Sequence, residues 1–386
     1  MVDYDFLSVY FYSVPNLRFS YKGDWSKRKL NEICHFFKGN GLSKSDLSNE
    51  GFPCILYGEL YTTYKNEVIS DIISKTNTTL SNPFLSRNND LIIPGSGEDP
   101  IDIAVARAIY QNDIILGGDL NILRPKSNVS AAFLSYQLNG VRRYDIAKKA
   151  QGKSIVHLHN SDLKEVLVSI PSCDEQLHIV KLLTKIDEMI ETQSKIIDDY
   201  NSLKMGIYNC MFKENYADYK LKQLAYIVKG DQINNDQLLS NGSYYMMNGG
   251  ASPSGYLDSY NVSENTISIS EGGNSCGYVQ FNSSPFWSGG HCYTIQNVNS
   301  ALIENKYLYH YLKYKEKEIM NLRIGTGLPN IQKKDLENFT ILVPSLLIQR
   351  KNLALFEMLD EKTSILNEEL ANLQKQKKYL LCNMFI

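Results

Sequence analysis

The sequence predicts an α+β protein in which two mixed α/β lobes form a tandem repeat, separated by two long antiparallel helices. These helices are expected to form a coiled-coil spacer with pseudo-two-fold symmetry. Three observations lead to this prediction. The chain contains an internal repeat, each copy ends in a long apolar run at helical spacing, and each copy begins with short strand-like runs bounded by turn residues.

The internal repeat includes positions in both the lobes and the helices. Pro171-Ser172 in the first copy matches Pro344-Ser345, which lies 173 residues later (171 against 344). The same spacing relates Gly152 to Gly325, Gln176 to Gln349, Asp187 to Asp360, and Met211-Phe212 to Met384-Phe385. At the front of the copies the spacing is 191 residues (38 against 229), which aligns Lys38-Gly39 with Lys229-Gly230. The changed spacing indicates that the copies differ by insertions in their middles.

Between the shared positions the two copies have largely different residues. We interpret this as one scaffold that carries two different recognition surfaces. The alternative is a duplication followed by drift, in which the differences have no function. The predicted segments are a first lobe at 14–170, a first helix at 171–212, a second lobe at 213–343 and a second helix at 344–386.

Within the first lobe, turn residues separate short elements. Asp24–Leu47 is expected to open with a helix or a strand and to turn at Lys38-Gly39. Phe52–Tyr64 and Asp90–Gly97 are expected to be strands. Ser130–Ala150 is predicted to be helical and to end in a basic cluster.

The two long helices carry apolar residues at coiled-coil spacing. The predicted seam residues are Ile186, Ile190, Ile197, Tyr200, Leu359, Leu366, Leu370 and Leu373. Ser172 and Glu175 have the spacing of a capping box at the start of the first helix. The second helix has Ser345 as a possible cap but Ile348 where the glutamate would stand.

Each seam contains one lysine at the matching place, Lys204 and Lys377. A polar residue in a seam usually sets the register of the helices at some cost in stability. Alternatively, both lysines extend into solvent from a short overlap between the helices. The sequence leaves both interpretations open.

Chain order constrains how the predicted lobes are arranged. Roughly 38 helical residues at about 1.5 Å each give a rod of about 57 Å. One lobe precedes the first helix and the other follows it, so we expect the lobes at opposite ends. If the second helix packs its seam antiparallel on the first, two inverted lobes are held apart by a two-helix spacer.

The loops Gln151–Leu163 and Ile324–Leu336 occupy the same place in the two copies and are candidate contacts to double-stranded DNA. Such loops can offer backbone N–H groups and short donors to phosphates, although a surface turn without a ligand is the alternative. Base reading would need Arg, Lys, Asn or Gln side chains from the divergent middles. The predicted DNA-binding residues are Lys38, Lys44, Arg87, Arg107, Arg142, Arg143, Gly152, Lys153, Ser154, His157, Lys229, Asn234, Gln237, Asn248, Asn274, Gly325, Thr326, Gly327, Asn330 and Lys333.

Several other functional classes are disfavoured. The formal net charge is −2, so any nucleic-acid surface must be local. Gln151–Ser154 resembles the end of a P-loop, but Ala147 stands where its first glycine would be, and a helix is expected before it. His157 and His159 alternate as on a strand, and a polar edge is the simpler interpretation than a metal pair. We expect no catalytic residue, no metal and no cofactor.

Neither a membrane span nor a disulfide framework is predicted. The longest apolar run, near Phe6–Pro15, is too short to cross a bilayer and has no basic leader. The seven cysteines are scattered and include no C-x-x-C pair, which fits a reducing compartment. We therefore expect a cytoplasmic protein.

Several long motifs, in order, resemble the DNA-specificity (S) subunits of bacterial type I restriction–modification systems over nearly the whole chain. These motifs are "VPNLRFSYKGDWSKRKLNEI", "KGNGLSKSDL" with "CILYGELYTTY", "GKSIVHLHNSDLKEVLVSIPSCDEQLHIVKLLTKIDEMI", and "GTGLPNIQKKDLENFTILVPS". The sequence departs from the pattern at Ile348, where the second "EQ" pair would have its glutamate, and this affects only local capping.

The resemblance implies two target-recognition domains, each reading one half of a bipartite asymmetric DNA site, with the helices setting the spacing. It implies that the chain docks two methyltransferase subunits and, through the complex, restriction/translocase subunits. Those partners would supply S-adenosylmethionine and ATP chemistry, and this chain would catalyse nothing. The alternative is a scaffolding protein that uses its two lobes to bind protein partners.

Overall fold

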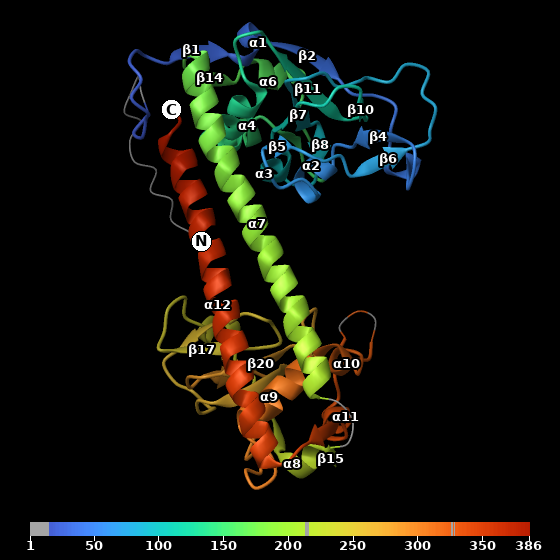
Figure 1. Ribbon diagram of the computed structural model, residues 1–386, viewed down its shortest axis with the longest axis vertical. Helices are drawn as coiled ribbons and strands as arrows, with labels where there is room; N and C mark the ends of the chain where they lie inside the picture. The colour runs from blue at the N-terminus through green and yellow to red at the C-terminus, as the bar shows by residue number, and fades with distance from the viewer. Residues whose placement is uncertain (1–14, 213–215, 326, 328) are drawn as a thin grey trace. The chain divides into compact units, whose positions relative to one another are not determined.

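The computed structural model describes residues 15–212, 216–325, 327 and 329–386. The chain forms two compact units (Figure 1). Unit 1 comprises Met1–Ser194 and Glu368–Ile386, and unit 2 comprises Lys195–Asn367. Two long helices, α7 (Cys173–Met211) and α12 (Leu346–Asn383), each contribute residues to both units. The predicted class is confirmed, with two mixed α/β parts and two long helices.

Unit 1 is built around a five-stranded sheet in the order β2-β11-β7-β9-β5. All five residues of its central strand β7 (Asp90–Pro94) are buried. Leu91 and Ile93 face a core that contains helix α4 (Ala131–Asn139), whereas Ile92 faces a second core on the opposite side. This alternation follows from the two-residue period of a strand, and burial on both faces explains why β7 is apolar without interruption between its ends.

The remaining elements of unit 1 are short. The other strands of the main sheet are β2 (Cys34–Lys38), β11 (Leu120–Pro125), β9 (Arg107–Ile109) and β5 (Val68–Ile69). Three smaller sheets contain β10 (Ile115–Leu116), β4 (Phe52–Ile55), β6 (Ser74–Thr76) and β3 (Leu47–Ser48); β12 (Gln151–Gly152), β13 (Val156–His157) and β8 (Ser96–Gly97); and β1 (Ser26–Lys29) with β14 (Leu167–Ile170). The helices are α1 (Leu30–Ile33), α2 (Glu59–Thr62), α3 (Pro100–Ile103), α5 (Arg143–Ala147) and α6 (Asn160–Lys164), with a 3-10 turn η1 (Lys44–Asp46).

Unit 2 repeats this plan with one strand fewer in its main sheet, whose order is β16-β22-β19-β20. These strands are β16 (Tyr226–Lys229), β22 (Cys292–Gln296), β19 (Thr266–Ser270) and β20 (Val279–Asn282). The smaller sheets contain β17 (Tyr244–Met247), β18 (Gly255–Leu257) and β21 (Trp287–Ser288), and β15 (Ala217–Lys220) with β23 (Thr340–Val343). The helices are α8 (Leu221–Leu224), α9 (Asn305–Tyr314), α10 (Glu316–Met320) and α11 (Lys333–Glu337), with a 3-10 turn η2 (Asn235–Gln237).

Equivalent glutamines join each lobe to the long helix that follows it. In unit 1, Gln176 accepts a hydrogen bond from the backbone N–H of Ser130 and donates to the carbonyls of Pro171 and Asn128. In unit 2, Gln349 accepts from the backbone N–H of Glu304 and donates to the carbonyls of Pro344 and Leu302. Ser130 and Glu304 are the N-caps of α4 and α9. Each glutamine therefore accepts a backbone N–H at a helix start that would otherwise have no hydrogen-bond partner.

Three details of the sequence prediction were wrong. The strand expected at Phe52–Tyr64 ends at Ile55 and gives way to α2. The helix expected at Ser130–Ala150 is divided into α4 and α5 at Gly140, whose backbone is not helical; a Cβ there would lie 3.0 Å from the Tyr136 carbonyl oxygen. Ser172 does cap α7, but the Glu175 carboxylate does not complete a capping box; it accepts hydrogen bonds from Arg18 and Trp25.

The two long helices run antiparallel within each unit. In unit 1, Gln193 of α7 donates to Glu369 of α12 over 3.0 Å, and nearer the start of α7 Asp187 meets Lys377. In unit 2, the rings of Tyr208 and Phe356 lie 4.8 Å apart. The eight predicted seam residues are all at least half-buried; Ile186, Ile197, Leu359 and Leu366 are buried, and Ile190, Tyr200, Leu370 and Leu373 are intermediate.

Candidate nucleic-acid interface

The paired loops of the two copies are closed by backbone pairs at equivalent positions. In unit 1, Gln151 pairs with His157 and Gly152 with Val156. In unit 2, Ile324 and Asn330 form the corresponding bridge. Gly152 has a φ of +133°, and a Cβ there would lie 2.0 Å from the Ile155 carbonyl oxygen, so this position requires glycine.

The residue after each loop is hydrogen-bonded to the end of a central strand. In unit 1, the Leu158 N–H donates to the Gly95 carbonyl over 2.9 Å, just after β7. In unit 2, the Ile331 N–H donates to the Glu271 carbonyl over 2.8 Å, just after β19. Gly95 and Glu271 in turn donate to the carbonyls of Asp119 and His291. The two loops are therefore held by equivalent backbone bonds, which involve no side chain.

The loop of unit 1 presents a polar surface. Lys153, Ser154 and His157 are exposed, as the sequence suggested. The rings of His157 and His159 are parallel, with centroids 6.1 Å apart, so both lie on one face of the chain. In the described ranges, no group of three or more His, Cys, Asp or Glu residues could hold a metal ion.

In unit 2 a groove of about 380 Å³ lies beside the corresponding loop. Three predicted DNA-binding residues, Lys229, Asn248 and Asn330, line it. Asn248 is held in place because its side-chain oxygen accepts the backbone N–H of His291 over 2.9 Å. The groove is also lined by Gly249, Glu271, Gly272, Gly273, His291 and Pro329.

The other predicted residues of unit 2 are not all brought together. Asn234, Gln237, Asn274, Gly325, Gly327 and Lys333 are exposed, and none of them lines the groove. Lys333 lies 3.7 Å from Glu337 in an exposed ion pair within α11. Thr326 lies outside the described residues.

Three of the predicted arginines are used inside unit 1. The Arg107 side chain is buried, and its guanidinium donates to the carbonyls of Leu60 and Tyr64 over 3.1 and 2.9 Å. Arg142 donates to the Ile386 carbonyl and Arg143 to the Ile101 carbonyl, and both are half-buried. These contacts leave Arg107 without a surface to offer DNA, so the prediction that it reads a base was wrong.

The other predicted residues of unit 1 remain available at the surface. Lys38, Lys44 and Arg87 are exposed. Lys44 lines a cavity of about 700 Å³ together with Leu42, Tyr57, Glu59 and Asp119. Lys44 and the exposed loop therefore supply cationic groups on unit 1, as Lys229 does on unit 2.

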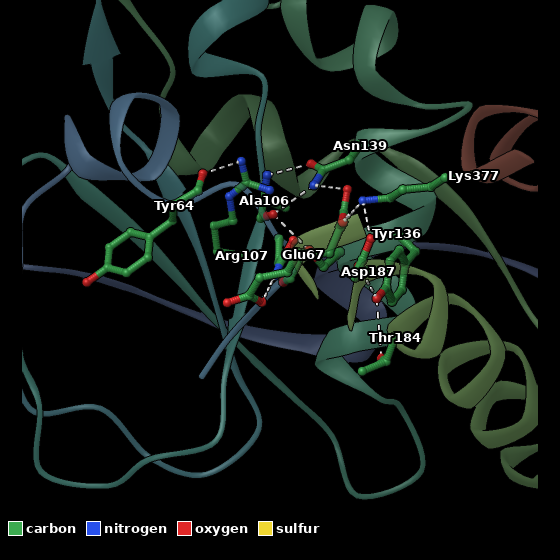
Figure 2. Close-up of polar contacts among 12 residues, drawn as sticks. Tyr64, Glu67, Ala106, Arg107, Tyr136, Asn139, Thr184, Asp187 and Lys377 are labelled. Carbon is green, nitrogen blue, oxygen red and sulfur yellow. Dashed lines mark hydrogen bonds and ion pairs between the residues drawn. The ribbon is translucent and has the colours of Figure 1, made fainter. Parts of the chain in front are cut away.

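Lys377 forms a buried ion network in unit 1 (Figure 2). Its ammonium lies 2.6 Å from carboxylate oxygens of both Glu67 and Asp187, and its side chain is 17% exposed. Tyr136 donates to Asp187 over 2.7 Å. Burial and the neighbouring Glu67 raise the pKa of Asp187, whereas the two carboxylates raise the pKa of Lys377 against the effect of its own burial.

Lys204 forms the corresponding pair in unit 2, with Asp360. His310 lies 3.8 Å from the same carboxylate and hydrogen-bonds to Tyr208 over 3.0 Å. Burial lowers the pKa of His310 to about 4, so the ring is neutral near pH 7. Both lysines are thus ion-paired between the long helices, and the alternative that they simply extend into solvent was wrong.

The sequence identifies the family to which a chain with this geometry belongs. Residues 22–199 and 213–375 each match the type I restriction modification DNA specificity domain. The chain belongs to this family. It is a type I specificity-subunit homologue with two such domains, one beginning in each copy of the repeat.

Known relatives support the assignment. A putative type I specificity subunit of Mycoplasma pneumoniae is 34% identical over 155 residues, which cover 40% of this chain and 41% of the relative. A putative type I restriction enzyme specificity subunit of Methanocaldococcus jannaschii is 22% identical over 93% of this chain and 92% of its own length. The crystal structure of the type I S subunit of M. genitalium matches with a TM-score of 0.66 at 20% identity, covering 97% of this chain and 99% of that one, which establishes the fold.

No helix in the described part of this family member is long and apolar enough to cross a membrane.

Sequence reasoning had aligned Asp187 with Asp360 and Lys204 with Lys377 but did not connect the two pairs. It missed Glu67 and Glu271 altogether. A signal for the ion pairs was present, because opposite charges that recur at the same two positions of both helices indicate paired partners.

Proposed function

We propose that this chain is the DNA sequence-recognition subunit of a type I restriction–modification complex, in which each unit reads one half of a bipartite, asymmetric site. One observation carries the proposal. The two units hold their loops in the same backbone frame, anchored at Gly95 and Glu271, while the side chains around the frame differ. A common frame with different side chains is what two different half-sites require.

Within each unit the proposal separates contacts to the DNA backbone from contacts to bases. The loops at 151–157 and 324–330 would bind phosphates through backbone N–H groups and short polar side chains. The groove of unit 2 would read base edges with Lys229, Asn248 and Asn330. On unit 1, Lys44 and Arg87 are the exposed candidates for that role.

The family membership supports the proposed partners. The chain would dock two methyltransferase subunits and, through the complex, restriction/translocase subunits, and would itself be non-catalytic. The helices α7 and α12 would set the distance between the half-sites. All seven cysteines are unpaired, four of them buried, which suits the reducing cytoplasm in which such a complex would act.

Sequencing of methylated bases tests the proposal directly. A host carrying the gene and its methyltransferase partner should methylate a split motif, and deletion of the gene should abolish that motif. Persistence of every split motif after deletion would contradict the proposed function. A protein-binding scaffold would show neither motif loss nor tight, salt-dependent binding to duplex DNA.

The loops and the helices can be tested separately. Lys153→Ala should weaken binding about equally on all sequences and reduce the salt dependence by about one phosphate contact, whereas Lys181→Ala, an exposed site on α7, should change neither.

Removing residues 190–196 and 368–374 takes one heptad from each helix and retains both Lys–Asp pairs. The unread gap between the half-sites should shorten, and an unchanged gap would contradict the role of the helices.

A further inference from the structure

Glu271 places a carboxylate in the groove of unit 2, beside the loop that is proposed to bind DNA phosphates. Its side chain is 10% exposed and the residue lines the groove. An anionic group at a DNA-binding surface repels phosphates, so any contact that it makes with DNA is to a group other than the backbone. The only hydrogen-bond donors that duplex DNA offers in its grooves are the exocyclic amino groups of the bases.

The two oxygens of this carboxylate have different surroundings. Oε1 lies 2.5 Å from the Lys229 ammonium and accepts a hydrogen bond of 3.2 Å from the Tyr293 hydroxyl. Oε2 accepts no hydrogen bond from any residue that the structure describes, and the Nδ1 atom of His291 lies 3.4 Å away. A buried acceptor normally has a hydrogen-bond partner. Oε2 is itself buried, so a donor from DNA reaches it only if the neighbouring His291 ring, which is 62% exposed, turns aside.

The scaffold does not demand this carboxylate. Gly95 occupies the same backbone position in unit 1, with the same hydrogen bonds to the neighbouring turn and to the residue after the loop. A Cβ on Gly95 would lie 2.7 Å from the Asp119 carbonyl oxygen, so unit 1 cannot hold a side chain there. The acid is therefore a feature of one recognition surface and not of the shared fold.

We propose that Glu271 reads an exocyclic amino group of a base in the half-site bound by unit 2, through Oε2 once the His291 ring has turned aside, while Lys229 and Tyr293 orient the carboxylate. This deepens the proposed DNA-recognition function and rests on it. The amino group belongs to cytosine or adenine if the major groove is read, and to guanine if the minor groove is read. Lys229 is half exposed and can pair with a phosphate or with a guanine edge once DNA is bound.

The test selects binding sites for the full-length chain from a random duplex library. The wild-type chain should enrich a bipartite motif with one position in one half restricted to a base that presents an amino group in the groove read. Glu271→Gln retains one acceptor and adds a donor, and it should relax that position by roughly five- to hundredfold in relative affinity. Glu271→Ala removes the acceptor and frees Lys229, and it should move the preference toward guanine at or beside that position.

The other half of the motif is an internal control for folding, because unit 1 should read it unchanged in both variants. Glu264→Gln alters an exposed acid of the same lobe and should leave every position as in the wild type. Relaxation confined to one position supports base reading by Glu271. Unchanged preferences in both variants, or equal loss in both halves, would overturn it while the proposed function stands. Absence of any bipartite motif for the wild-type chain would instead refute the proposed function.

Discussion

The ion networks of units 1 and 2 start from the same Lys–Asp pair and differ in what surrounds it. In unit 1, Lys377 serves two carboxylates, and both Glu67 and Asp187 are buried. In unit 2, Lys204 pairs with Asp360, whose side chain is 39% exposed. The additional carboxylate comes from the residue just before β5, the strand that the main sheet of unit 2 lacks. Unit 1 thus has a buried network that also ties α12 to its lobe, where unit 2 has a half-exposed ion pair between the helices.

The largest expected effect is on the buried network. Lys377→Met keeps the length of the side chain and removes its charge, which leaves two carboxylates buried without a cation. Breaking a buried pair in this way costs about 3–5 kcal/mol, so we expect the free energy of unfolding of unit 1 to fall by that amount. Trp25, which is buried in unit 1, reports this unfolding by fluorescence in a Trp287→Phe background.

The neighbouring Lys378→Met is the matched control, because Lys378 is exposed and outside the network. Its effect should remain within about 0.5 kcal/mol. A loss below about 1 kcal/mol for Lys377→Met would show that the network does not hold unit 1 together.

The second effect is a response to acid that is confined to unit 2. His310 has a folded-state pKa of about 4, below its ordinary value of 6.5. A lowered pKa means that its contribution to stability is complete above pH 6.5 and is lost as the pH falls through about 4. The shift corresponds to about 3 kcal/mol. Chemical denaturation of the Trp25→Phe variant, followed through Trp287, should show this loss between pH 6.5 and 4.

His310→Gln should remove most of that slope, because glutamine does not titrate. In unit 1, a group of the corresponding ion network changes stability with pH in the opposite direction. Asp187 has a raised pKa, so its contribution is present at low pH and is lost as the pH rises through the folded-state value. An equal acid slope in wild type and His310→Gln would mean that another group controls the acid stability of unit 2.

The smallest effect is expected for the half-exposed pair. Lys204→Met leaves Asp360 partly solvated, and its charge can be hydrated when the lysine is lost. The free energy of unfolding of unit 2 should fall by only about 1 kcal/mol. A loss as large as that of Lys377→Met would remove the contrast between the two networks.

Much of the fold follows from the sequence, and the reasons are local. The heptad spacing predicts α7 and α12, and the matched glycines predict loops such as that at Gly152, because both depend on residues close together in the chain. Arg107 shows where this reasoning ends. It is predicted to read a base because it is an arginine in the divergent middle of the first copy, although Ala106 and Ala108 beside it indicate a tightly packed strand. Its partners Leu60 and Tyr64 lie more than forty positions away.

Glu67 and Glu271 were missed for the same reason. Neither belongs to a motif, and each acquires its role from residues that are distant in sequence, such as Lys377 for Glu67. For Glu271 the partner Lys229 is among the predicted residues, but the two come near each other only through the strand order β16-β22-β19 of the main sheet. Long-range pairing of charges is decided by packing, which periodicity does not encode.

The hydrogen bonds of Gln176 and Gln349 affect which lobe residues can be substituted in proteins of this architecture. Gln176 and Gln349 hold the lobes only through main-chain atoms: the N–H of Ser130 or Glu304 and the carbonyls of Asn128, Leu302 and the two prolines. Every amino acid supplies a main-chain carbonyl, and all except proline supply an N–H. These hydrogen bonds are therefore indifferent to almost any substitution at the lobe residues that make them, and those residues can change while this part of the attachment to the helix is retained.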